Sequence, residues 1–195
     1  SSIVRRVDEQ YYTDEWAKCC LLLYKKELLQ KPPLCLQRLF FRHPDKMKMF
    51  LEENPSRSFD VENDYYLPEE AYQDKRAFDC WAECLYEEFP EILGYIMGKS
   101  CNGKDGAFPH EFIREFLEKQ QNEKLTKAVF YGKFNSRGAR IVQDGRTLYE
   151  QAKCYRAQAR ELRLKFPQSA KILLQLAKWM ESEAQHDQLE AEIVP

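Results

Sequence analysis

The chain has 195 residues, of which 44% are hydrophobic and 32% are charged, and its net charge is −2. This length suffices for one compact domain, and the high charged fraction is typical of solvated helix faces. The longest apolar run, residues 19–24, is far shorter than the roughly 20 residues of a membrane-spanning helix, so we expect no membrane span. Seven glycines and the lack of long apolar–polar alternation argue against a β-sheet protein.

Helix signals divide the first half of the chain into short segments. Thr13 precedes two acidic residues and predicts a helix start, and this helix should end before the proline pair at 32–33. We predict a short helix over residues 34–42 and a new helix from Pro44. Pro68, followed by two acidic residues, predicts a helix that continues to about residue 89.

Similar signals continue through the middle of the chain. Pro90 predicts another short helix, residues 102–106 have the composition of a turn-rich loop, and Pro109 predicts the next helix start. Residues 125–130 fit either a short helix or an extended piece. We expect an irregular loop over residues 132–146, which contain three of the seven glycines.

The clearest pattern lies between residues 145 and 192, on both sides of Pro167. Apolar residues recur there at alternating steps of three and four, which places each set on one stripe of a helix. The pattern predicts two long helices that close as an antiparallel hairpin. The predicted seam residues are Leu148, Ala152, Tyr155, Ala159, Leu162 and Phe166 on the first helix, and Ala170, Leu173, Ala177, Met180 and Ala184 on the second.

Charge is distributed unevenly along the chain. Residues 44–100 hold 6 Lys/Arg against 14 Asp/Glu, a balance of −8, whereas residues 132–165 hold 9 against 3, a balance of +6. The two segments could neutralise each other within the fold or across a homo-oligomer. Alternatively, the basic segment meets a nucleic acid or an acidic protein.

Four cations of the predicted loop form a candidate anion-binding or partner-binding site. They are Lys133, Arg137, Arg140 and Arg146. Arginine offers a forked donor, glycine lets backbone amides approach a ligand, and the loop ends where a long helix begins. The alternative is an ordered loop whose cations pair with acids of the same chain. The segment matches neither a P-loop nor a dinucleotide-binding fingerprint.

Three arginines at helical spacing extend this candidate surface along the first hairpin helix. They are Arg156, Arg160 and Arg163. Lys153 and Lys165 belong to the same stripe. If the chain folds back at Pro167, we expect Lys153 to lie near Glu181 and Glu183, and Arg146 near Asp187, which would pair part of this stripe. In that register Arg160 and Arg163 have no acid opposite them, so they are the strongest candidates for contact with a partner.

Arg38 and His43 have the Arg-x4-His spacing of HEPN ribonucleases, and the six residues between and including them resemble that family's motif. The resemblance implies metal-independent RNA cleavage, with both residues at a dimer interface. The alternative interpretation is that His43 ends a helix before Pro44, where the negative end of the helix dipole favours it.

Other residue clusters give no support for a metal or a cofactor. The seven cysteines lack paired spacing, which favours reduced thiols in a cytoplasmic protein. Cys80 and Cys84 lie one helical turn apart, but no second ligand pair accompanies them, so we predict two thiols rather than a zinc site. The acids at 60, 62 and 64 lack the glycine and the closing glutamate of a calcium loop. Three scattered histidines give no order typical of a catalytic triad.

From Asn135 to Asp187 the chain resembles the C-terminal part of small, uncharacterised bacterial proteins from plasmids, prophages and accessory islands. The resemblance is carried by the Asn-Ser-Arg-Gly element at 135–138, by Gly145, and by the apolar and charged positions of the two hairpin helices. It implies a bacterial intracellular setting and a role in mobile-element or anti-phage defence systems. It implies no activity.

The sequence therefore predicts an all-α protein, a compact bundle of short helices with a long C-terminal antiparallel helical hairpin. We expect a single domain over residues 1–195, with a division into 1–131 and 132–195 as the alternative. The predicted function is a non-enzymatic binding subunit that contacts an acidic protein partner through the basic loop and helix. Binding to a nucleic-acid backbone and HEPN-like RNA cleavage are the alternatives, and a homo-oligomer fits the uneven charge.

Overall fold

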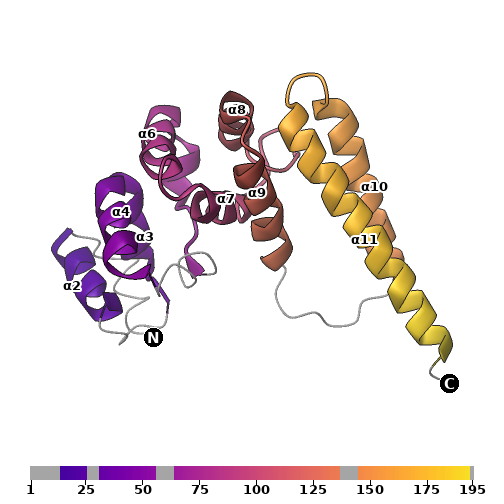
Figure 1. Ribbon diagram of the computed structural model, residues 1–195, viewed down its shortest axis with the longest axis horizontal. Coiled ribbons are helices and arrows are strands. Elements are labelled where there is room, and N and C mark those ends of the chain that lie inside the picture. Colours follow the sequence, from indigo (N-terminus) through magenta and orange to yellow (C-terminus); the bar gives the residue numbers. More distant parts are fainter. Residues whose placement is uncertain (1–13, 26–30, 56–63, 137–144, 194–195) are drawn as a thin grey trace.

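The computed structural model describes residues 14–25, 31–55, 64–136 and 145–193, and in these ranges it contains helices and no strand. The predicted all-α class is therefore confirmed. In chain order (Figure 1) the elements are α2 (Asp14–Lys25), α3 (Leu34–Arg42), α4 (Pro44–Glu53), the 3-10 helix η2 (Glu69–Tyr72), α6 (Lys75–Tyr86), α7 (Pro90–Gly98), α8 (Glu111–Gln120), α9 (Glu123–Asn135), α10 (Gly145–Leu162) and α11 (Pro167–Ile193).

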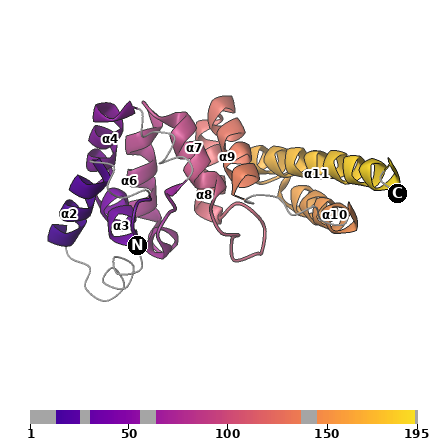
Figure 2. The same cartoon turned by 90° about the horizontal axis from the view of Figure 1, so that it is seen from below.

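The molecule is elongated, with the short helices at one end and the hairpin at the other. Helices α2, α3 and α4 lie at one end, α6 to α9 form the middle, and α10 and α11 form the far end in two perpendicular views (Figures 1 and 2). None of the helices in the described ranges combines the length and the apolar character needed to cross a bilayer.

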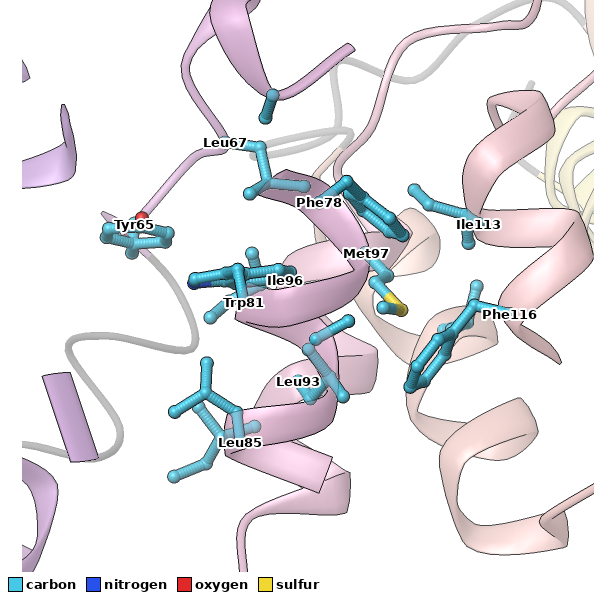
Figure 3. Close-up of a cluster of buried hydrophobic side chains, with 14 of the residues drawn as sticks. Tyr65, Leu67, Phe78, Trp81, Leu85, Leu93, Ile96, Met97, Ile113 and Phe116 are labelled. Carbon is cyan, nitrogen blue, oxygen red and sulfur yellow. The ribbon is translucent and has the colours of Figure 1, made fainter. Parts of the chain in front are cut away.

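A continuous hydrophobic core connects these parts. One cluster of buried side chains extends from Ala17 in α2 to Leu176 in α11. Its centre is formed by α6, α7 and α8, where Phe78, Trp81 and Met97 pack together (Figure 3). Because the hairpin shares this core, it is anchored on the bundle by apolar burial as well as by the chain itself.

The predicted hairpin is confirmed. Helix α10 ends at Leu162, the chain reverses over residues 163–166, and α11 begins at Pro167 and packs along α10. Every predicted seam residue is buried except Tyr155, which is half-buried. The steps of three and four were sufficient for the seam, although α11 also buries Ile172 and Leu176 outside it.

Two predicted boundaries are wrong. The helix expected from Pro68 to residue 89 is divided, because Asp74 accepts hydrogen bonds from the backbone N–H groups of Arg76 and Ala77 and so caps a new helix, α6. The loop expected to begin at Gly132 begins later, because α9 continues to Asn135. Gly132 and Lys133 are therefore helical residues, and they form no loop that could cradle an anion.

Gly132 lies where α9 crosses α7 at very close range. A Cβ atom added at Gly132 would stand 2.2 Å from the carbonyl oxygen of Tyr95, and one added at Gly98 would stand 2.3 Å from that of Val129. Both obstacles are backbone atoms of a packed helix, which cannot move as a flexible side chain can. The two glycines therefore allow the two helices to approach each other, and this approach sets the position of α9 beside the hairpin.

We expect Gly132→Ala to lower the free energy of unfolding by about 1–3 kcal/mol, because the added methyl forces α7 and α9 apart. Urea unfolding followed by circular dichroism measures this change. Lys124→Ala, at an exposed position of the same helix, is the matched control and should stay within about 0.5 kcal/mol of the wild type. An unchanged or raised unfolding midpoint for Gly132→Ala would contradict the close crossing.

Candidate docking surface at the hairpin turn

A buried guanidinium organises the loop that leads into α8. Arg114 is 1% exposed, and its two terminal nitrogens donate to the carboxylate oxygens of Asp105 at 2.6 and 2.7 Å. Its Nε donates to the carbonyl oxygen of Pro109 at 2.6 Å, and Nη2 also donates to that of Ala107. A buried charge is tolerated only when its donors are satisfied, so Arg114 fixes the shape of this loop.

The hairpin rests on this fixed loop. The side chain of Gln158 in α10 donates to the carbonyl oxygen of Gly106 at 3.3 Å and accepts from the backbone N–H of Phe108 at 3.4 Å. The guanidinium carbon of Arg114 lies 5.8 Å from the centre of the Phe166 ring, at the end of the hairpin turn. These contacts join α10 to the loop before α8, and the hairpin turn to Arg114 of α8 itself.

Glu118, one turn after Arg114 on α8, holds the start of α11. Its carboxylate accepts hydrogen bonds from the backbone N–H groups of Gln168, at 2.8 Å, and Ser169, at 3.4 Å. These amides are among the unsatisfied donors of a helix N-terminus, where a negative charge is favoured. Burial nevertheless raises the pKa of Glu118, although both hydrogen bonds act in the opposite direction. No local sequence pattern predicts this cap, because Glu118 is distant from α11 along the chain.

Once these contacts are made, the outer side of the hairpin turn remains in solvent. Leu164 is 90% exposed, the highest value among the exposed large hydrophobic side chains of the described residues. Arg160, Arg163 and Lys165 surround it in the sequence, and all three are exposed. We call Arg160, Arg163, Leu164 and Lys165 the basic tip. It lies at the turn between α10 and α11, at the top of the hairpin in Figure 1.

Arg160 and Arg163 lack acidic partners, whereas Arg156 is neutralised. In the described part of the chain neither Arg160 nor Arg163 makes an ion pair, as their lack of opposing acids predicted. Arg156, in contrast, donates to both carboxylate oxygens of Glu181, at 2.7 and 2.5 Å. Because Arg156 is paired, its charge is no longer available for a partner. The candidate surface is therefore limited to the cations nearer the turn.

One predicted ion pair of the hairpin is wrong. Glu181 was expected beside Lys153, but it pairs with Arg156, and Lys153 instead pairs with Glu150 of its own helix at 2.7 Å. Helical side chains lean toward the N-terminus of their helix. In an antiparallel hairpin Arg156 therefore leans away from the turn and Glu181 leans toward it, so the two meet although their backbones are offset.

Of the four predicted loop residues, the structure describes two, Lys133 and Arg146, and they lie on different helices. Arg137 and Arg140 lie outside the described residues. Lys133 belongs to α9, and its ammonium lies 4.5 Å from the centre of the Phe108 ring, on the loop that Arg114 fixes. Arg146 is exposed in the first turn of α10, at the opposite end of that helix from the basic tip.

Arg38 and His43 have different structural roles. Arg38 and Arg42 of α3 both pair with the carboxylate of Glu70, at 3.6 and 2.9 Å. His43 ends α3 and precedes Pro44, with φ −129° and ψ 74°, outside the helical region. Arg38 thus lies within α3 and is paired with Glu70, and His43 lies just beyond the end of that helix. His43 therefore has the position that the alternative interpretation of the sequence predicted, at the end of a helix before Pro44.

Within the described ranges no three His, Cys, Asp or Glu side chains gather in a way that could hold a metal ion. Cys80 is exposed and Cys84 is half-buried, and both are free thiols. Burial raises the pKa of Cys84, which makes its thiol less reactive near neutral pH.

The ionised form of Asp105 should contribute to stability in a defined pH range. Hydrogen bonds from Arg114 lower the pKa of Asp105 from 3.8 to about 2. Because the folded-state pKa is the lower one, this contribution is present above about pH 4 and is lost as the pH falls to about 2. We expect Asp105→Asn to be less stable than the wild type at pH 7, with the difference shrinking across this range.

Urea unfolding midpoints of both proteins between about pH 2 and about pH 7 provide the measurement. Glu69→Gln, at an exposed acid in η2, is the control for removing one carboxylate. A difference between the wild type and Asp105→Asn that stays constant over the whole range would contradict the role of the Arg114 contact.

Comparisons of the chain with protein-family models, with curated proteins and with solved structures find no match in any of the three. The function must therefore be argued from the geometry and chemistry of the chain itself.

Proposed function

We propose that the protein is a non-enzymatic binding subunit whose basic tip docks on an acidic surface of a protein partner. The observation that carries the proposal is Leu164, a large apolar side chain left 90% exposed between Arg163 and Lys165. The bacterial defence setting implied by the resemblance remains part of the proposal.

The composition of the basic tip fits a protein interface. Such interfaces combine a small apolar centre, which loses its water on binding, with a polar or charged rim. Leu164 would supply the centre and contribute up to about 2 kcal/mol when fully buried. Arg160 and Arg163 would supply the rim, and because they make no ion pair with another described residue, binding breaks none there.

The same composition fits a nucleic-acid backbone less well. Arginines can contact phosphates, but a backbone of phosphates and sugars offers no apolar pocket for Leu164. The neutralisation of Arg156 by Glu181 also shortens the row of cations that would follow a strand. A leucine, two guanidiniums and an ammonium include no group that exchanges protons near neutral pH, which supports binding rather than catalysis.

The test is capture of partners on the immobilised full chain from a nuclease-treated lysate of the native host, followed by titration of the purified partner. We expect a protein to be retained after nuclease treatment. Leu164→Ser should raise its dissociation constant about tenfold, equivalent to about 1.4 kcal/mol of lost apolar burial. The double variant Arg160→Ala, Arg163→Ala should weaken binding most at low salt.

The matched control is the double variant Lys124→Ala, Lys127→Ala, which removes two exposed cations of α9 outside the basic tip and should bind normally. Equal affinity of all variants would refute the proposal. Labelled single-stranded and duplex DNA test the alternative function. Affinity that falls steeply with salt, with a slope reduced by the arginine replacements, would establish nucleic-acid binding instead.

A further inference from the structure

An exposed face of α4 mirrors the basic tip with the opposite charge. Its exposed side chains are Asp45, Met49, Glu52 and Glu53, which recur at helical spacing and so share one side of the helix. Met49 is 54% exposed. We call these four residues the acidic stripe. Like the basic tip, it places one exposed apolar side chain among charges of a single sign.

Among the described residues, acids outnumber cations around the acidic stripe. The half-buried Lys48, which precedes Met49, is already paired with Glu88 at 2.5 Å. Lys46 is the other cation of α4 and is half-buried. The exposed Glu87 and Glu91 flank the junction of α6 and α7, the former one residue from Glu88.

The two surfaces cannot meet within one molecule. Helix α4 lies at one end of the elongated body and the hairpin lies at the other, in both views (Figures 1 and 2). The acidic and basic segments of the sequence therefore lead to oppositely charged surfaces at the two ends of the molecule. Other acids of the N-terminal half pair with nearby cations, as Glu70 does with Arg42 and Glu83 with Lys119. Contact between tip and stripe requires a second molecule.

We propose that the basic tip of one molecule docks on the acidic stripe of a second copy of this chain. This inference rests on the proposed function and names the partner of the same tip. Opposite charges steer the two ends together, and Leu164 and Met49 meet at the centre of the contact. Methionine adapts its shape to such a neighbour because its side chain is flexible and polarisable.

The geometry of this contact determines how the protein assembles. Tip and stripe are different surfaces, so the contact is heterologous, and a bound pair still presents one free tip and one free stripe. The protein should therefore form head-to-tail chains that lengthen with concentration rather than stop at a two-fold dimer. A contact built on one helix turn and one helix face is smaller than the roughly 1,000 Å² of stable interfaces, so the association should be weak.

Sedimentation velocity on the full chain tests this inference. We expect the weight-average sedimentation coefficient to rise with protein concentration at about 0.01 M ionic strength, where the Debye length is about 30 Å. The rise should disappear at about 1 M, where that length is about 3 Å. A wild-type protein that sediments as a monomer at every concentration at low salt would overturn the inference.

Charge reversal and mixing identify the two surfaces. The tip variant Arg160→Glu, Arg163→Glu and the stripe variant Glu52→Lys, Glu53→Lys should each lose self-association, because their two ends carry the same sign. Mixed in equal amounts they should associate again, since each tip then finds a stripe of opposite charge. Lysines at positions 52 and 53 also suit the C-terminal turn of α4, which should preserve the fold. Lys124→Glu, Lys127→Glu is the matched control and should behave as the wild type.

The outcomes separate this inference from the proposed function. If the mixed variants stay monomeric while the wild type associates, tip-to-stripe contact is overturned. If the wild type stays monomeric but captures another protein through Leu164, the proposed function holds and the second copy is rejected as the partner. Met49→Ser changes no charge and should weaken self-association even if the reversed variants misfold, and unchanged association of this variant counts against the inference.

Discussion

Arg114 carries a permanent positive charge on a side chain that is almost entirely buried, and the junction between bundle and hairpin depends on it. Its donors are occupied by Asp105 and by two backbone carbonyls of the loop before α8. Leaving such a charge without its partner costs about 3–5 kcal/mol, so the loop has little freedom to change shape. Gln158 then binds this loop, and Glu118 binds the start of α11 from the same helix.

These contacts decide which part of the hairpin remains available. They use the inner side of α10 and the beginning of α11, and the exposed turn is what they leave. Farther from the turn, the pair between Arg156 and Glu181 closes the hairpin on itself. The close crossing of α7 and α9 at Gly132 also helps to position the hairpin, because α11 packs on α9. The exposed hairpin turn thus results from the anchoring of the hairpin.

The sequence predicted what depends on periodicity and missed what depends on single contacts between distant residues. The hairpin seam repeats over many residues, so its helices, its turn and the solvent exposure of Arg160 and Arg163 could be predicted. Residues 132–135 were predicted as a loop because glycine is common in loops. Gly132 instead allows α9 to cross α7 closely, and this contact is visible only in the fold. The role of Arg114 has no local pattern, since its partners lie in a loop that it shapes itself.

The position of the arginines at the tip has an internal physical reason, and the position of Leu164 has none in the described structure. Arg160 and Arg163 stand at the C-terminal end of α10, where the negative end of the helix dipole favours cations without any partner. Their exposure alone is therefore weak evidence for binding. A leucine gains nothing from the dipole, and 90% of Leu164 is exposed to water. Of the four residues of the proposed docking surface, Leu164 is therefore the one whose exposed position the helix end does not favour.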